Sequence, residues 1–242
     1  SLRVTAAEID AFLGFVNEGL PNLKLARDDV VYAYAGLRPL VDDGSKNSYT
    51  ASRRAEIVDH VGEGGPANLL STIGGKWTTS RDIAAKAVDL IGEKLGSTRK
   101  CDTDEAPLPG STGPFRLFVE RMSVKHREFT PSIVQNLARN YGARAEEAVA
   151  LTKGEPALAR CISQRLPDIA AQVSFAVRSE MALTLDDVLF RRTGLGTLGP
   201  LGPRAVEDVA EIMAAELGWS ETEQRRQIAS IAWRYEALGT GA

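Results

Sequence analysis

The stretch from Leu69 to Arg81 constrains the fold of this chain more than any other segment. It begins as an apolar run typical of a β-strand, passes through Gly74 and Gly75, and ends as the first turn of a helix. Two consecutive glycines let a backbone turn tightly and approach another molecule closely. Lys76 follows at once, so unpaired N–H groups at a helix start lie beside a cation, which suits an anionic or electron-rich group. The same pattern also makes an ordinary tight connection, and the pattern alone leaves both interpretations open.

The composition indicates a soluble globular protein with a substantial core. The chain has 242 residues, of which 43% are hydrophobic and 25% charged, enough for one large domain or two ordinary ones. A net charge of −3 argues against nucleic-acid binding, which usually needs a basic excess. The sequence contains no apolar run of the ~20 residues that a membrane helix needs and no signal-peptide pattern, so we expect a cytoplasmic location.

The metal-binding residue types are too dispersed to predict a metal site. Cys101 and Cys161 lie far apart in the sequence and form no C-x-x-C pair, so we expect two free thiols in a reducing cytosol. His60 and His126 lack the companions that a transition-metal site needs. Both histidines are interpreted as surface or packing residues.

The first half of the chain reads as a mixture of helices and strands. A capping box from Thr5 to Glu8 predicts a helix that ends near Gly19. Residues 29–34 are rich in β-branched and aromatic types and predict a strand. Residues 54–61 and 67–73 flank a glycine-rich turn, which predicts an antiparallel hairpin.

A helix is predicted after Thr79 and is expected to end near Gly96. Its apolar residues recur at helical spacing on one face. These residues are Ala84, Val88, Ile91 and Leu95.

The segment from Ser97 to Gly113 is charged and then rich in proline and glycine, and it predicts a domain boundary. Beyond it the caps and apolar periods predict almost only helices. Their expected ranges are 131–141, 145–151, 168–181, 184–192, 204–217 and 220–238. The fold class expected is therefore α+β and mostly helical overall, with a mixed α/β region over residues 1–110 and an all-α helical bundle over residues 111–242.

Four stretches, taken in order, resemble one enzyme family. They are Y-A-G-L-R-P-L from Tyr34, Ser52-Arg53, G-G-K-W-T-T-S-R from Gly74, and D-D-V-L-F-R-R-T from Asp186. Together they resemble the C-terminal half of FAD-dependent glycerol-3-phosphate dehydrogenase. The resemblance implies a flavoprotein that oxidises sn-glycerol 3-phosphate to dihydroxyacetone phosphate and passes the electrons to membrane quinone, or to oxygen in the related oxidases.

The resemblance also implies that part of such an enzyme is missing. These enzymes hold the FAD pyrophosphate with a G-x-G-x-x-G motif that opens a helix, and no such motif with a following helix occurs here. We therefore expect a fragment, with residues 1–110 as the C-terminal segment of the FAD and substrate domain. Its expected partner is the missing N-terminal FAD-binding half, and the fragment alone is expected to retain no FAD and to be inactive.

The resemblance assigns the cofactor contacts to the glycine-rich stretch. The residues that match the segment at the pyrimidine end of the flavin are Gly74, Gly75, Lys76, Trp77 and Thr78. Their backbone donors and the lysine charge would stabilise negative charge at that edge. The sequence departs from the family pattern at Trp77, where leucine is common, and at Ser80, where tyrosine is common.

Substrate contacts are assigned to Arg38, Arg53 and Lys76, because a guanidinium fork or an ammonium suits phosphate oxygens. Arg38 has a structural alternative in pairing with a nearby aspartate, and Arg54 competes with Arg53 for the substrate position. The arginines at 191 and 192 are interpreted as structural, since the last turn of a helix favours cations. The aromatic residues Tyr32, Tyr34 and Trp77 are interpreted as core rather than as cofactor platforms.

A second function from another class remains open at this stage. Residues 114–242 would then form a helical interaction module that docks a partner protein or the membrane surface, and a large exposed apolar patch would favour it. The resemblance is also compatible with peripheral association with the inner face of the cell membrane and with a homodimer.

Overall fold

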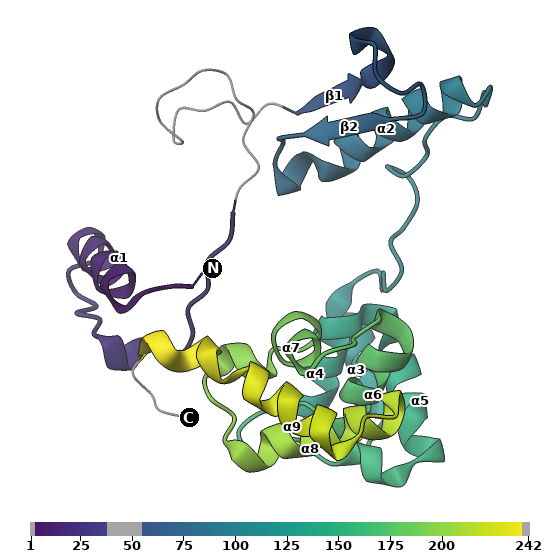
Figure 1. The fold of residues 1–242 in the computed structure, drawn as a ribbon. Helices are drawn as coiled ribbons and strands as arrows, with labels where there is room; N and C mark the ends of the chain where they lie inside the picture. Colours follow the sequence, from purple (N-terminus) through teal and green to yellow (C-terminus); the bar gives the residue numbers. More distant parts are fainter. Residues whose placement is uncertain (1–2, 38–54, 239–242) are drawn as a thin grey trace. The chain divides into compact units, whose positions relative to one another are not determined.

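The computed structural model describes residues 3–37 and 55–238 (Figure 1). The chain forms two compact units. The hairpin unit is Gly36–Leu108, and the helical unit joins Ser1–Ala35 to Pro109–Ala242. The boundary after Leu108 lies close to the predicted division at 110/111, whereas the first 35 residues group with the helical unit. The assignment of residues 1–110 to a FAD and substrate domain stays a prediction.

The first predicted helix is present as α1 (Ala6–Gly19). The Thr5 hydroxyl accepts from the Glu8 N–H, and the Glu8 carboxylate accepts from the Thr5 N–H at 2.8 Å, which completes the predicted capping box. The strand predicted at 29–34 was wrong. A 3-10 turn η1 (Arg27–Asp29) precedes an irregular segment, because no strand in the described ranges pairs with it and an extended segment needs such a partner.

The predicted hairpin is confirmed, with shorter strands. β1 (Glu56–Asp59) pairs antiparallel with β2 (Leu70–Ile73), so that Glu56 lies opposite Ile73. The chain leaves β1 through the 3-10 turn η2 (His60–Glu63), which is capped by Gly64 in the left-handed conformation at φ 75°. This turn uses residues that the sequence pattern placed in the strand.

The helix after the hairpin is α2 (Ser80–Lys94), preceded by the 3-10 turn η3 (Trp77–Thr79). The α2 residues Ile83, Ala87 and Leu90 are half-buried, whereas the apolar face from Ala84 to Leu95 is exposed. No side chain that the structure describes between residues 55 and 108 is buried. The hairpin unit therefore has no core of its own within the described residues.

The helical unit carries the core, and its fold class is the predicted one. Besides α1 and the turn η1, its helices are α3 (Phe115–Lys125), α4 (Pro131–Tyr141), α5 (Ala145–Gly154), α6 (Ala170–Glu180), α7 (Leu185–Asp187), α8 (Pro203–Leu217) and α9 (Glu221–Ser230). Its shorter turns are η4 (Gly142–Arg144), η5 (Pro156–Ala159), a π-helix η6 (Val188–Arg192), η7 (Leu195–Leu198) and η8 (Ala232–Leu238). Together with the two-stranded hairpin, these elements make a mostly helical α+β protein.

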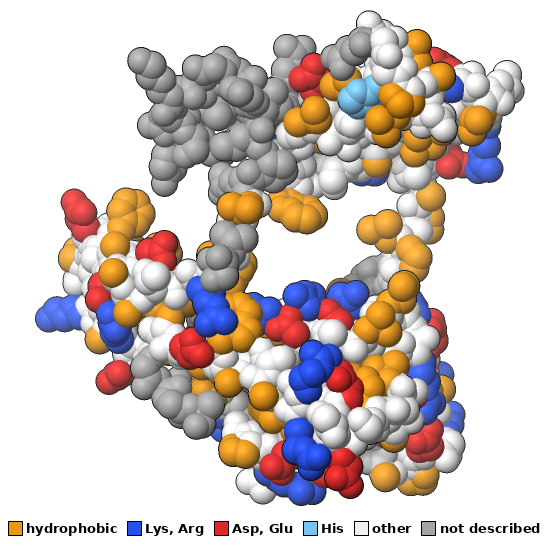
Figure 2. Space-filling view, viewed as in Figure 1, with side chains coloured by type: hydrophobic (Ala, Val, Ile, Leu, Met, Phe, Trp, Pro, Cys, Tyr) orange, Lys and Arg blue, Asp and Glu red, His pale blue; other side chains and the backbone are white. Residues whose placement is uncertain are grey.

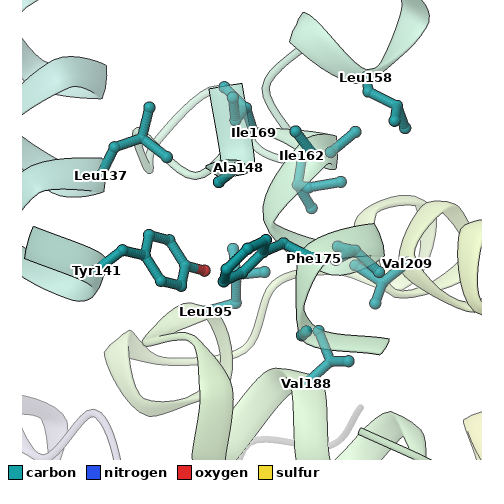
Figure 3. Close-up of a cluster of buried hydrophobic side chains, with 14 of the residues drawn as sticks. Leu137, Tyr141, Ala148, Leu158, Ile162, Ile169, Phe175, Val188, Leu195 and Val209 are labelled. Atoms are coloured by element: carbon teal, nitrogen blue, oxygen red, sulfur yellow. The ribbon is translucent and has the colours of Figure 1, made fainter. Parts of the chain in front are cut away.

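The central element of the helical unit is α6, which packs against α5 and α8. Every residue from Ala170 to Ala176 is buried, because a helix that is apolar nearly all round needs neighbours on every side. Figure 3 shows Phe175 of α6 facing Tyr141 of α4, and their rings meet edge to face with centroids 5.1 Å apart. This contact joins two helices of the core.

Several helix ends follow the predicted signals. The Thr130 hydroxyl caps α4 with Pro131 in its first turn, and Gly218 ends α8 in the left-handed conformation. The last predicted helix is divided into α9 and η8. At its start the Ser220 hydroxyl accepts from the Glu223 N–H, but the Glu223 carboxylate binds Arg226 at 2.6 Å instead of closing the capping box.

No helix among residues 3–37 and 55–238 is long and apolar enough to cross a membrane.

Candidate functional site

The connection between β2 and α2 depends on its two glycines. Gly74 and Gly75 have φ angles of 70° and 91°, in the region that favours glycine. A Cβ placed on Gly75 would lie 2.6 Å from the Cδ1 atom of Ile83 in α2. The strand end therefore approaches the helix too closely for any side chain at position 75.

Lys76 occupies the position before the first turn of the helix, with an extended backbone at φ −129° and ψ 154°. Its N–H donates to the Thr79 hydroxyl at 3.3 Å, and its carbonyl accepts from the Thr79 N–H at 3.0 Å. The donors left for a ligand are thus the first N–H groups of the turn, those of Trp77 and Thr78. The Lys76 side chain is exposed and forms no ion pair within the described part of the chain.

The start of α2 has the donors and the charge that the anionic edge of a reduced flavin would require. An exposed ammonium and two backbone donors at a helix start can together receive an anionic group.

The indole of Trp77 is 95% exposed, so its interpretation as a core residue was wrong for the described chain. Tyr34 is 79% exposed, and the same correction applies to it. Among the described residues, too few side chains contact either ring to bury it.

The structure brings together only part of the predicted site. Gly74, Gly75, Lys76, Trp77 and Thr78 form one continuous segment of the hairpin unit. Arg38 and Arg53 lie outside the described residues, and their convergence on Lys76 stays a prediction.

The stretch from Asp186 to Thr193 lies in the helical unit and is held by its own charges. Asp187 closes a capping box, because its carboxylate accepts from the Thr184 N–H at 2.9 Å. Asp186 pairs with Arg191 at 2.7 Å and with Arg234 at 2.5 Å. The Asp186–Arg234 pair is mostly buried, with 18% and 17% of the side chains exposed, and it ties this stretch to the end of the chain.

The structural interpretation of the two arginines in this stretch is confirmed. Arg191 bridges Asp186 and Asp187, and the Arg192 Nε donates to the carbonyl of Glu180 at 2.9 Å. Both arginines lie at the end of the π-helix η6, in which the Thr193 N–H donates to the Val188 carbonyl at 3.0 Å. Both arginines of this stretch are therefore paired with groups of the protein itself.

An aromatic cluster joins the start of the helical unit to its end. The half-buried ring of Tyr32 stacks on Phe190 with centroids 5.5 Å apart and meets Tyr235 edge-on at 6.2 Å. The ring of Phe190 also covers Gly196, where a Cβ would lie 2.5 Å from it. The expectation of a packing role is therefore met for Tyr32.

The sequence patterns did not predict one buried polar group in the core. The Gln172 amide donates to Asp168 at 3.2 Å and accepts from the Ile169 N–H at 3.0 Å and from Asn136 at 3.4 Å. Burial raises the pKa of the Asp168 carboxyl, and bonds from Asn136 and Gln172 offset part of that rise. The available signal was Gln172 itself, the one polar amide in the apolar run from Ile169 to Val177.

His126 is a further buried titratable group, at 3% exposure. Its two ring nitrogens face Glu146 at 3.0 Å and Glu128 at 3.3 Å. The packing role expected for it is thus confirmed. The described residues contain no group of three or more His, Cys, Asp or Glu side chains that could hold a metal ion.

Comparison with known proteins identifies the family of this chain. Residues 101–224, slightly more than half of the chain, match the family described as the C-terminal domain of alpha-glycerophosphate oxidase. The chain therefore belongs to the glycerol-3-phosphate dehydrogenase and oxidase family and carries its C-terminal domain.

Curated relatives extend the similarity beyond that domain. A glycerol-3-phosphate dehydrogenase of Synechocystis is 36% identical over 231 residues, which cover 93% of this chain and 41% of the relative. Glycerol-3-phosphate dehydrogenase 2 of Mycobacterium tuberculosis H37Rv is 31% identical over 96% of this chain and 39% of its own length. A D-erythritol 1-phosphate dehydrogenase of Brucella abortus is 32% identical over 77% of this chain and 37% of its own length. The chain thus spans about two-fifths of the length of the curated relatives it matches.

Proposed function

We propose that this chain supplies the C-terminal part of an FAD-dependent dehydrogenase that oxidises sn-glycerol 3-phosphate to dihydroxyacetone phosphate. The observation that carries the proposal is the similarity to glycerol-3-phosphate dehydrogenases over 93% and 96% of the chain. The region outside the matched C-terminal domain contains the segment Gly74 to Thr78, so the similarity extends to both units.

The exposed segment after the hairpin has the chemistry for the cofactor role. FAD, when bound, supplies an acceptor for the hydride that leaves the substrate carbon bearing the alcohol. The ammonium of Lys76 and the N–H groups of Trp77 and Thr78 would hold its pyrimidine end and stabilise the negative charge that develops there. Arg38 and Arg53 would bind the phosphate of the substrate, with Lys76 as a further cation.

The electron acceptor proposed is membrane quinone. The relatives are named dehydrogenases, which supports an acceptor other than oxygen, whereas the family description names an oxidase. The protein would then work on the cytoplasmic side, in peripheral contact with the inner face of the membrane, and a homodimer is compatible with this arrangement. Reduction of a soluble quinone analogue compared with release of hydrogen peroxide distinguishes the two acceptors.

A second substrate deserves a direct comparison because one relative is named for it. The Brucella relative is a D-erythritol 1-phosphate dehydrogenase and covers 77% of this chain. Both substrates are polyol phosphates, so the same cations would bind either phosphate. Rates with sn-glycerol 3-phosphate and D-erythritol 1-phosphate, measured side by side, decide between them.

The alternative of a helical docking module has less support. The large exposed apolar side chains described between residues 114 and 242 are spread over α3, the loop after α6 and η7. They are Phe115, Leu117, Val124, Met181, Leu183 and Leu198. Such a distribution over three segments does not define one apolar face of the kind that docking uses.

The proposal is tested with two preparations. The first is the chain alone, which should purify colourless and oxidise neither polyol phosphate, because its sequence has no G-x-G-x-x-G that opens a helix. The second is a fusion in which the part of the Synechocystis relative that precedes the aligned region is joined to this chain. The fusion should show a flavin spectrum and reduce a dye with sn-glycerol 3-phosphate. Stoichiometric flavin on the chain alone, or a flavin-loaded fusion without activity on either substrate, would contradict the proposal.

A further inference from the structure

The helix α2 has three faces with different environments. At 3.6 residues per turn, Ile83, Ala87 and Leu90 fall on one face, and this face packs on the hairpin. Lys94 lies on the same face and pairs with Asp59 of β1 at 2.8 Å. The polar residues are at positions 82, 86, 89 and 93, on the opposite side of the helix from the remaining apolar residues.

The remaining face is apolar and exposed. Ala84, Val88, Ile91 and Leu95 follow one another at steps of four, three and four residues, about 100° around the axis from the face on the hairpin. Val88 is 59% exposed, Ile91 42% and Leu95 80%. We call these four residues the α2 stripe. Figure 2 shows hydrophobic side chains at the surface over the part of the chain that carries β1, β2 and α2.

An apolar stripe of this regularity is typical of a buried helix face, because solvent-facing positions are usually polar. The surrounding unit strengthens the argument, since its described residues include no buried side chain. Among the residues described in this unit the sheet has two strands, and a two-stranded hairpin is marginally stable alone in water. The helical unit, by contrast, has a continuous core from Phe118 to Ile231. The described part of the hairpin unit thus presents the kind of apolar face that another polypeptide covers.

The relatives indicate which polypeptide completes it. The matched domain is a C-terminal one, and the hairpin unit lies on its N-terminal side. About three-fifths of each relative lies beyond the aligned region. We propose that the α2 stripe docks against the N-terminal polypeptide of the flavoprotein, the part that corresponds to this remainder of the relatives. This inference rests on the proposed function for the identity of the partner.

The docking places the segment from Gly74 to Thr78, which is proposed to contact the cofactor, at the same interface. Trp77 and Thr78 form the turn that leads directly into α2, so a polypeptide that covers the stripe also reaches the start of the helix. Burial of the stripe would then complete both a hydrophobic core and the surroundings of Lys76. A second copy of this chain is the competing occupant.

Cysteine labelling tests the proposal without relying on activity. Val88→Cys is made in a background with Cys101→Ser and Cys161→Ser, and the probe is a maleimide dye. In the chain alone Val88→Cys should react rapidly. In the fusion with the N-terminal part of the Synechocystis relative, its labelling should slow by about tenfold or more, because a side chain in an interface is reached only through local opening. Glu93→Cys, on the polar face of the same helix, should label equally fast in both preparations.

The remaining outcomes separate this proposal from the function. Equal labelling of Val88→Cys in the chain and in a flavin-loaded fusion would overturn the docking, even if the fusion oxidises the substrate. If Val88→Cys in the chain alone becomes more protected as the protein concentration rises, the stripe binds a second copy of the chain. That result would also overturn the proposed docking. A fusion that protects Val88→Cys but oxidises neither polyol phosphate would uphold the docking and contradict the proposed function.

Discussion

The hydroxyl of Tyr235 donates to the backbone carbonyl of Gly196 at 2.6 Å, across 39 positions of the sequence. Both residues lie in the helical unit and both are buried. Burial raises the pKa of the Tyr235 hydroxyl to about 12, so the donor keeps its proton at every pH at which the protein is handled.

Removal of that hydroxyl should destabilise the helical unit. In Tyr235→Phe the Gly196 carbonyl stays buried without this donor, and we expect a loss of about 1–3 kcal/mol in the free energy of unfolding. Urea unfolding of wild type and variant at pH 7 measures it, with the exposed Tyr34→Phe as the control. The difference should be the same at pH 6 and pH 9, and a pH-dependent difference would contradict the assignment.

Asp168 makes the stability of the helical unit depend on pH. Its folded-state pKa is raised by burial above the ordinary value of 3.8. The stability that comes from its protonated form is fully present below 3.8 and is lost as pH rises through the raised pKa. Asp168→Asn keeps the shape and removes the ionisation, so this variant should melt above wild type at pH 8 and the gap should close toward pH 3.5.

Thermal melts across this pH range check the Asp168 prediction. Asp82→Asn is the matched control, because Asp82 is exposed in its pair with Lys86. A gap that widens on acidification, or a variant less stable than wild type at pH 8, would show that the carboxylate form is the one that the core holds.

Gly75→Ala should unfold the hairpin unit selectively. The new methyl group meets Ile83 and the backbone has φ 91°, so overpacking costs about 1–3 kcal/mol and left-handed strain about 1–2 kcal/mol. Ile83→Val removes the clashing Cδ1 atom, and the double variant should recover the steric part only. Hydrogen exchange of α2 amides measures the effect, with Gly62→Ala, whose site is open, as the control. Full protection in Gly75→Ala would contradict the close approach.

Lys76→Met in the flavin-loaded fusion tests the flavin contact proposed for Lys76. The substitution keeps the length of the side chain and removes the charge, so kcat/KM should fall by about 10²-fold or more. The flavin potential should fall as well, while the melting temperature should change little because the side chain is exposed. Lys100→Met, exposed in the same unit, is the control. An unchanged rate and potential with a lower melting temperature would make Lys76 a structural residue.

Sequence patterns predicted best those elements whose signals are local. The capping box at Thr5, the Thr130-Pro131 start of α4 and the glycine stop of α8 depend on neighbours within one or two turns, and the structure has all three. The strand predicted at residues 29–34 failed because strand formation needs a pairing partner, which propensity does not supply.

The candidate site was predictable only as a segment. Gly75 could be read as a close approach from its type, but its contact with Ile83 depends on how α2 packs on the hairpin. Arg38 and Arg53 lie outside the described residues, so their placement rests on the resemblance. The buried polar group at Asp168 and Gln172 is formed by three side chains and the Ile169 N–H. One of these side chains, that of Asn136, comes from α4, so no single stretch of sequence carries that information.

The π-helix at Val188–Arg192 limits how the chain can vary in length. Its wide turn contains one residue more than an α-helical turn, and the Val188 to Thr193 bond spans it. Deletion of a single residue there would restore an ordinary helix but rotate every later side chain by about 100° relative to those before it. Arg191 would then leave its two aspartates and Arg192 the carbonyl of Glu180. Substitutions in this stretch are therefore expected to be tolerated more readily than any insertion or deletion.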